Sequence, residues 1–293
     1  MRTVYLGTSD FAVTILDRLA DSPHRPTLVV TRPDRPAGRG RKLQSPPVAD
    51  AARALGIPVA QPDRLADDEP TQHVLAEEPD ALIVCAYGAI VREPLLSART
   101  IYNVHPSLLP RWRGAAPIER AIAAGDTETG VSIMALEEGL DSGPVAIQQA
   151  EPIHPDDTYG TLAPRLADLG AELLIRALDE QPPFIAQPED GITYAEKITA
   201  DDRTLDPSAP AAASALMVRA LSPHIGTRIA LDDGSMLGVH EARVIEGVAD
   251  DDQLHVADGV ARLGALELLR VQPPGGKPMA AADWLRGRQG ASR

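Results

Sequence analysis

The chain of 293 residues is 44% hydrophobic and 24% charged, and its net charge at pH 7 is −14. This balance is typical of a globular protein with a sizeable core, and the length favours two domains. The negative charge argues against a general nucleic-acid binder, because phosphate contacts require Lys and Arg. The single cysteine excludes a disulfide within the chain, no apolar run approaches the roughly 20 residues of a membrane span, and the N-terminus does not resemble a signal peptide. We therefore expect a cytoplasmic protein that does not bind membranes.

Short apolar runs alternate with helical patterns over the first half of the chain. Strands are predicted at residues 3–6, 27–31, 57–61, 81–87, 101–105 and 131–136, and helices at residues 10–20, 45–55 and 70–78. This alternation indicates βαβ units and an open, mostly parallel sheet. Ligands of such sheets bind beyond the carboxyl ends of the strands. Residues 7–9, 87–88 and 103–105 follow predicted strands, so we expect them to border one cleft.

The second half changes in character after a long helix predicted over residues 155–181. A proline-punctuated, extended segment follows, and then a helix predicted over residues 209–221. Short strand-like pieces come next, with Asp-Gly turns among them, at residues 228–231, 237–239, 254–256 and 266–271. The pattern predicts a catalytic domain over residues 1–188, a linker over 189–205 and a small β domain over 206–293.

An Asn and a His stand two residues apart at the end of the strand predicted at residues 101–105. Their spacing places the side chains of Asn103 and His105 on the same side of the strand. An amide N–H and an imidazole that face one cleft can stabilise a developing oxyanion. The alternative is a capping Asn and a core or surface His. The other histidines show no paired metal-ligand spacing, so no metal site is predicted.

A glycine-flanked acid follows the strand predicted at residues 131–136. Asp141 lies between Gly139 and Gly143 in the segment EEGLDSGPV, and glycines allow unusual backbone geometry and close approach of a ligand. The alternative is a solvated turn acid. No competing catalytic pattern is present: the chain lacks G-x-S-x-G and H-E-x-x-H, and its first turn, GTSDFA, is not the G-x-G-x-x-G of a dinucleotide-binding enzyme.

The acidic chain contains one basic segment, TRPDRPAGRGRK, at residues 31–42. It holds five basic residues against one acid, Asp34: Arg32, Arg35, Arg39, Arg41 and Lys42. On its own this segment suits a solvated loop and a phosphate-binding loop equally well.

Together these motifs resemble the 10-formyltetrahydrofolate-dependent formyltransferase superfamily. The spacing of Asn103, His105 and Asp141 is similar to that of the superfamily's catalytic triad. The segments SLLPRWRGAAPI (107–118) and GLDSG (139–143) add to this resemblance. Four further segments resemble, in order, the branch that acts on methionyl-tRNA: PDRPAGRGRKLQSPPV (33–48), AYGAIV (86–91), ITYAEKI (192–198) and VQPPGGKPMAAADWL (271–285).

The resemblance implies a Rossmann-like N-terminal α/β domain with a parallel-rich sheet and a small C-terminal OB-like β-barrel. It also implies the transfer of the formyl group of 10-formyltetrahydrofolate to the α-amino group of initiator methionyl-tRNA, without a metal. The product, N-formylmethionyl-tRNA, is used in translation initiation. We expect the enzyme to be a monomer.

The resemblance also implies roles for individual residues. The implied catalytic residues are Asn103, His105 and Asp141. The implied folate-binding residues are Cys85, Ala86, Tyr87, Gly88, Ser107, Leu108, Leu109, Pro110, Gly139 and Leu140. The implied tRNA-binding residues are Arg35, Arg39, Arg41 and Lys42, with Arg111 and Arg113 as further candidates for phosphate contacts. A cis peptide bond at Leu109–Pro110 is implied as well.

Two departures from the superfamily's pattern are visible. Pro106 stands where the pattern often has Gly, and residues 221–231 lack an expected Trp-containing piece. Two alternative functions stay open: a formyltransferase for a small amine, such as a nucleotide sugar or glycinamide ribonucleotide, and a non-catalytic folate- or RNA-binding protein. The basic segment and the β domain argue against the first, and the complete triad argues against the second.

Overall fold

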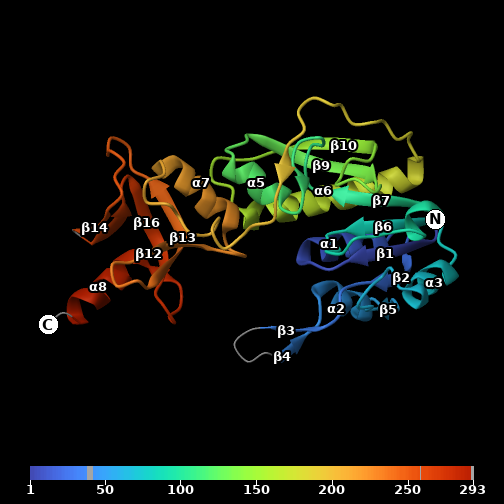
Figure 1. The fold of residues 1–293 in the computed structure, drawn as a ribbon, viewed down its shortest axis with the longest axis horizontal. Coiled ribbons are helices and arrows are strands. Elements are labelled where there is room, and N and C mark those ends of the chain that lie inside the picture. The colour runs from blue at the N-terminus through green and yellow to red at the C-terminus, as the bar shows by residue number, and fades with distance from the viewer. Residues whose placement is uncertain (38–41, 258, 292–293) are drawn as a thin grey trace. The chain divides into compact units, whose positions relative to one another are not determined.

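The computed structural model describes residues 1–37, 42–257 and 259–291 (Figure 1). The chain forms two compact units. The first contains Met1–Gly114, Thr129–Glu151 and Ala163–Tyr194, and the second contains Ala115–Glu128, Pro152–Leu162 and Ala195–Arg293. The units are interleaved in sequence, and the predicted domain boundaries at residues 188 and 205 stay a prediction. Among the described residues, no helix combines the length and apolar character that crossing a membrane requires.

A seven-stranded sheet forms the centre of the first unit (Figure 1). In spatial order its strands are β10 (Val145–Pro152), β9 (Glu128–Ala135), β7 (Thr100–His105), β6 (Ala81–Cys85), β1 (Thr3–Gly7), β2 (Pro26–Val30) and β5 (Val59–Ala60). Strand β1 pairs in parallel with β2 and β6, and β6 pairs in parallel with β7, whereas β9 runs antiparallel to β7. The predicted parallel-rich α/β sheet is confirmed, and β9 makes it mixed.

The central strands are buried along their whole length, which explains their continuous apolar sequences. Every residue of β1 and β6 is buried, as expected for strands with helices on both faces of the sheet. The helices of this unit are α1 (Asp10–Ala20), α2 (Pro47–Ala54), α3 (Asp68–Ala76), α4 (Leu95–Ala98) and most of α6 (Tyr159–Glu180). At Gly170 an added Cβ would lie 2.9 Å from Val104 Cγ1, so this glycine lets α6 pack closely against β7.

The carboxyl ends of β1, β6 and β7 lie side by side because these neighbouring strands are parallel. Residues 7–9, 87–88 and 103–105 therefore share one edge of the sheet, as predicted. A hydrogen bond joins two of these ends: Thr8 Oγ1 donates to the Tyr87 carbonyl at 2.7 Å. This edge is where an α/β sheet of this kind binds its ligands.

The basic segment forms a short antiparallel hairpin of β3 (Arg35–Ala37) and β4 (Lys42–Gln44). Gln61 supports its base, because Nε2 donates to Asp34 Oδ1 at 2.7 Å and to the Arg32 carbonyl at 3.0 Å. Arg39 and Arg41 lie outside the described residues.

The second unit is built on a curled antiparallel sheet that resembles half a barrel. Its strands run in the order β12 (Thr227–Ala230), β13 (Met236–Val244), β16 (Leu266–Gln272), β15 (Val260–Leu263) and β14 (Leu254–Ala257), with β17 (Met279–Ala280) also paired to β16. The predicted small β domain is confirmed. Helices α5 (Pro117–Ala123), α7 (Ala211–Leu221) and α8 (Ala281–Ala291) belong to this unit. The sequence pattern did not predict α8, although its Trp284 and Leu285 pack into the core of the sheet.

Candidate active site

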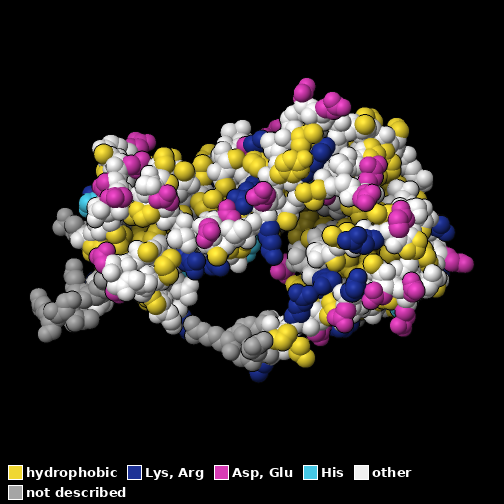
Figure 2. Space-filling view, in the orientation of Figure 1, with side chains coloured by type: hydrophobic (Ala, Val, Ile, Leu, Met, Phe, Trp, Pro, Cys, Tyr) yellow, Lys and Arg dark blue, Asp and Glu magenta, His cyan; other side chains and the backbone are white. Residues whose placement is uncertain are grey.

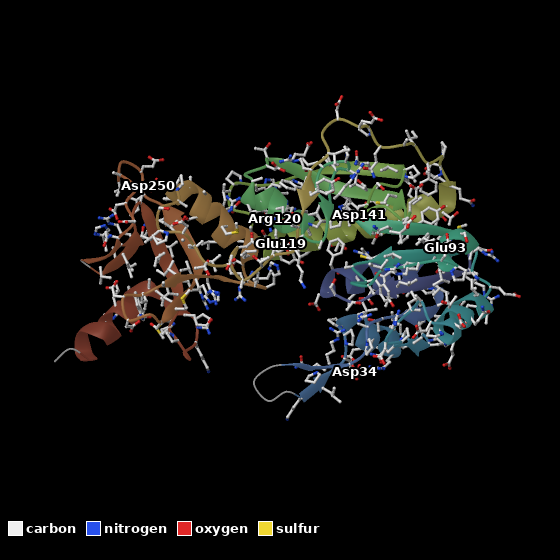
Figure 3. All side chains as sticks on the ribbon, viewed as in Figure 1. Asp34, Glu93, Glu119, Arg120, Asp141 and Asp250 are labelled. Atoms are coloured by element: carbon white, nitrogen blue, oxygen red, sulfur yellow. The ribbon has the colours of Figure 1, made fainter. Side chains whose placement is uncertain are left out.

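Three polar side chains meet at the end of β7, and Figure 3 labels one of them, Asp141. Asn103 Nδ2 lies 3.4 Å from Asp141 Oδ1, and His105 Nδ1 lies 3.7 Å from Asp141 Oδ2. Asn103 and His105 are 8% and 4% exposed, and the Asp141 side chain is 14% exposed. The expectation that Asn103 and His105 face the same side is confirmed, because both approach one carboxylate. The cluster offers a hydrogen-bond donor, an imidazole and an acid within one partly buried space.

The hydrogen bonds of His105 determine which ring nitrogen faces this space. His105 Nε2 lies 2.9 Å from the Trp112 carbonyl oxygen. A carbonyl oxygen only accepts hydrogen bonds, so Nε2 carries a proton and donates it. Nδ1 is therefore the nitrogen directed toward Asp141. A distance of 3.7 Å is too long for a hydrogen bond, yet close enough for the carboxylate to attract a protonated ring.

The loop that carries Asp141 is tightly folded at its base. The Ala135 N–H donates to the Pro144 carbonyl at 2.9 Å, and a Cβ at Gly143 would lie only 2.0 Å from the Ala135 carbonyl oxygen. Only glycine fits there, which explains one of the two glycines noted beside the acid. Asp141 itself has φ +45°, a left-handed conformation that costs a non-glycine residue about 1–2 kcal/mol.

A backbone donor fixes the Asp141 carboxylate. The Gly114 N–H donates to Asp141 Oδ2 at 2.8 Å. This contact joins the short strand β8 (Arg113–Gly114), which follows β7, to the loop that follows β9. The carboxylate is thus held by a group that cannot rotate away.

The predicted folate-binding residues after β6 differ in what they expose. Ala86 and Gly88 are exposed and have φ values of +44° and +74°. Cys85 and Tyr87 are buried, and burial raises the pKa of the Cys85 thiol to about 12. The thiol is therefore neutral at physiological pH, and it is shielded from solvent.

Two side chains that the sequence analysis did not single out, one on β9 and one on β10, hold the segment after His105. Ser132 Oγ donates to the Ser107 carbonyl at 2.6 Å, and Gln148 Nε2 donates to the Leu109 carbonyl at 3.0 Å. Ser107 is fully buried, and its hydroxyl donates to the Arg111 carbonyl at 2.6 Å. Its side chain therefore supports the loop. The Leu109–Pro110 peptide bond is cis, as the resemblance implied.

The remaining predicted folate-binding residues lie on the two segments that follow β7 and β9. Leu108 and Pro110 are partly exposed and Leu109 is buried, while Gly139 and Leu140 of the acid loop are exposed, Leu140 at 61%. An exposed leucine beside a polar cluster is suited to contact an apolar part of a ligand. These two segments thus expose backbone groups and one large apolar side chain, Leu140.

The predicted tRNA-binding residues are only partly described. Arg35 and Lys42 are exposed on β3 and β4, and Figure 2 shows Lys and Arg side chains gathered beside the base of this hairpin. The prediction that Arg113 contacts phosphate is wrong. Arg113 is 9% exposed, and its Nε and Nη2 donate to Gln187 Oε1 at 3.0 and 2.7 Å. Arg111 lies 4.3 Å from the centroid of the Trp112 ring.

Within the described residues, no group of three or more His, Cys, Asp or Glu side chains is arranged to hold a metal ion.

Comparisons with known proteins match formyl transferases over nearly the whole chain. A family model described as formyl transferase matches residues 1–178, and one described as the formyl transferase C-terminal domain matches residues 197–289. The methionyl-tRNA formyltransferase of Halorhodospira halophila is 45% identical, over 98% of this chain and 96% of that protein. The methionyl-tRNA formyltransferase of Gluconobacter oxydans is 43% identical, over 98% of this chain and 97% of that protein.

Solved structures share the fold. The methionyl-tRNA formyltransferase from Clostridium thermocellum superposes with a TM-score of 0.59 at 12% identity, over 84% of this chain and 95% of that one. HypX from Aquifex aeolicus in complex with tetrahydrofolic acid gives a TM-score of 0.66 at 15% identity, over 97% of this chain and 47% of that one.

Proposed function

This chain belongs to the formyl transferase family, and on that premise we propose that it transfers the formyl group of 10-formyltetrahydrofolate to the α-amino group of initiator methionyl-tRNA. One observation carries the chemistry: Asn103, His105 and Asp141 converge at the carboxyl end of β7. The acceptor follows from the relatives of 40–45% identity, which are methionyl-tRNA formyltransferases along nearly their whole length.

The reaction needs stabilisation of a negative oxygen. The amine nitrogen attacks the formyl carbon, a C–N bond forms, and the carbonyl oxygen becomes an oxyanion. Asn103 Nδ2 and the protonated Nδ1 of His105 donate hydrogen bonds to that oxygen in the proposed mechanism. The intermediate then breaks the bond between the formyl carbon and N10 of the folate, and restores the carbonyl on the new amide.

The protons also require a route. The attacking amine loses one proton, and N10 of the departing folate gains one. Asp141 is the acid within reach of both donors, so it accepts the amine proton directly or through a water molecule. Its carboxylate also lies 3.7 Å from His105 Nδ1, close enough to attract a charged imidazole.

The folate is a co-substrate in this proposal, and the strand-end backbone recognises it. The exposed backbone groups of Ala86, Gly88 and Gly139 supply donors and acceptors for a pterin ring, and the exposed Leu140 supplies an apolar contact. The basic hairpin of Arg35 and Lys42, with Arg39 and Arg41, contacts phosphates of the acceptor stem. The cytoplasmic location and the monomeric state stay predictions.

A formyl-transfer assay tests the proposal. Purified protein is mixed with 10-formyltetrahydrofolate and charged initiator methionyl-tRNA, with free methionine, a nucleotide-linked amino sugar and glycinamide ribonucleotide in parallel. We expect transfer to the tRNA alone. Transfer to a small amine would preserve the folate chemistry and overturn the tRNA acceptor, and the absence of any transfer would favour a binding protein.

A further inference from the structure

A segment that follows α6 returns to the site and contacts the acid loop. Two backbone hydrogen bonds between Val145 and Ile185, at 2.8 and 2.9 Å, set its register. Two residues later, Gln187 Nε2 donates to the Asp141 carbonyl at 2.8 Å and to the Gly143 carbonyl at 2.7 Å. One side-chain amide therefore holds the acid loop at two points.

The same side chain is held from its other end. Gln187 Oε1 accepts hydrogen bonds from Arg113 Nε and Nη2 at 3.0 and 2.7 Å. Arg113 precedes Gly114, whose N–H donates to Asp141 Oδ2. These contacts form a closed ring from Asp141 through Gln187, Arg113 and Gly114 back to Asp141. The ring fixes the carboxylate relative to its own backbone.

Asp141 needs such support because of its backbone conformation. A non-glycine residue in the left-handed region persists there only when surrounding contacts hold it. The two hydrogen bonds from Gln187 reach residues 141 and 143, on the turn itself. Without them, fewer contacts oppose relaxation of the turn, which would move the carboxylate away from Asn103 and His105.

Only an amide of this length satisfies both ends of the ring. The carbonyls of Asp141 and Gly143 require two N–H donors, and the buried Arg113 guanidinium requires an acceptor. A glutamate would keep the Arg113 contact but direct a carboxylate oxygen at two carbonyl oxygens. A methionine has a similar length and provides neither function.

We propose that Gln187 is a positioning residue for formyl transfer. Through its hydrogen bonds to the acid loop and to Arg113, it keeps the Asp141 carboxylate beside Asn103 and His105. This inference rests on the proposed function, because the effect is expressed as a rate of transfer. Gln187 does not touch the reacting atoms, so substrate affinity should change little and the chemical step should change most.

The first experiment compares Gln187→Met with a matched control, Gln72→Met, on the exposed surface of α3. For Gln187→Met we expect kcat to fall by about 10- to 100-fold, because a misplacement on the order of 1 Å has effects of that size. KM for methionyl-tRNA and for 10-formyltetrahydrofolate should stay within about 2-fold if positioning alone is lost. Gln72→Met should behave as the wild type. A kcat for Gln187→Met within about 2-fold of the wild type overturns the inference.

A double-mutant cycle separates positioning from general loosening. In the Asp141→Asn background, Gln187→Met should add less than about a 2-fold further loss, because the group it positions is already disabled. Full additivity of the two losses would overturn action through Asp141. Gln187→Glu is a second variant for the case that Gln187→Met folds poorly, because it keeps the Arg113 contact. Its kcat should also fall.

A spectroscopic readout keeps this inference distinct from the proposed function. Asn103 is the only asparagine of the chain, so selective ¹⁵N labelling of asparagine gives one side-chain amide signal. That signal should shift in Gln187→Met and not in Gln72→Met, because Asn103 Nδ2 faces Asp141 Oδ1. Wild-type protein that transfers no formyl group would defeat the proposed function, whereas an unchanged Asn103 signal in Gln187→Met would defeat the positioning role.

Discussion

Asn103 illustrates why a buried polar residue at a strand end deserves a functional interpretation. A buried amide loses its bonds to water, and this loss is unfavourable unless other groups replace them. The contact of Asn103 Nδ2 with Asp141 is long, at 3.4 Å, so it replaces those bonds incompletely. An amide with little stabilisation from its surroundings is well suited to donate to a charge that appears only during the reaction.

Replacing Asn103 by Ala should remove one oxyanion donor. We expect kcat/KM for formyl transfer to fall by about 100- to 1000-fold, equivalent to about 2.7–4 kcal/mol, because the lost hydrogen bond forms in the transition state. Steady-state kinetics at saturating folate would measure the effect, with thermal unfolding as a control for folding. A loss smaller than about 10-fold would remove Asn103 from the catalytic role.

The residues of the site differed in how well the sequence predicted them. The pairing of Asn103 and His105 followed from the period of a strand, which is a local property. Arg113 was misjudged, because a basic residue in a loop usually stays in solvent, and only the fold brings it beside Gln187. Ser132 and Gln148 carried no motif, and their role depends on the neighbouring position of β9 and β10.

The loops after β7 and β9 are the elements that build the site, and close backbone packing shapes the second of them. An added methyl group at Gly143 would overlap the Ala135 carbonyl oxygen at 2.0 Å. The loop would have to move away from β9, and Asp141 would move with it. The geometry of this element therefore depends on a residue without a side chain.

Gly143→Ala should reduce kcat by at least about 10-fold, because a displacement on the order of 1 Å at the acid has a cost of this size or larger. Gly287→Ala in α8 is the matched control, since its added Cβ would meet nothing within 4 Å. The control should retain full activity and gain slightly in helix stability. Full activity of Gly143→Ala would show that the acid loop tolerates the shift.

An ion pair ties α5 to the segment that precedes the β sheet of the second unit. Arg120 Nη1 lies 2.8 Å from Asp202 Oδ1 (Arg120 and the neighbouring Glu119 of α5 are labelled in Figure 3). Hydrogen bonds from Arg120 and from Thr199 lower the pKa of Asp202 to about 2. The ionised carboxylate is therefore more stable in the folded protein than in the unfolded chain.

This shift predicts a stability that depends on pH. Because the folded-state pKa of Asp202 lies below its unfolded value of about 3.9, the contribution is complete above pH ~4 and is lost as the pH falls toward 2. Asp202→Asn should lower the free energy of unfolding by about 1 kcal/mol at pH 7, since partial exposure weakens the pair. Urea unfolding of the variant and the wild type should converge near pH 2–3. Asp201→Asn is the control, and a pH-independent difference would contradict the assignment.

Elements with weak patterns were the ones that sequence analysis missed. Strand β10 lies at the edge of its sheet and is half exposed, so its sequence, VAIQQAEP, shows little apolar alternation. Strand β15 has four residues, and α8 reads as polar apart from Trp284 and Leu285. These segments become ordered by packing on stronger elements, which local propensity does not report.

Charge is unevenly distributed over the molecule, because an acidic chain contains one basic segment. The chain carries a net charge of −14, while the hairpin of β3 and β4 belongs to a basic segment. An acidic body repels a polyanion, so productive association has to depend on a small number of basic contacts.

Replacing Arg35 and Lys42 together by Ala should raise KM for methionyl-tRNA and leave KM for 10-formyltetrahydrofolate unchanged. Each lost phosphate contact reduces the slope of log affinity against log salt by about 0.7–0.9. Assays between low and moderate salt would measure that slope, with Arg18→Ala on α1 as the control. An unchanged salt slope would exclude these two residues from phosphate binding.

Local patterns in the sequence were enough to predict the α/β class, the small β domain, the shared strand ends and the common facing of Asn103 and His105, because period, spacing and turn chemistry are encoded over short distances. The route by which Asp141 reaches His105 required the fold. Strand β9 is antiparallel to β7 and ends beside Tyr102, so the acid loop has to fold back to the end of β7. The contacts that hold it there come from Gly114 and Gln187, which are far from Asp141 in sequence. Such contacts depend on strand order and direction, which no local pattern of residues specifies.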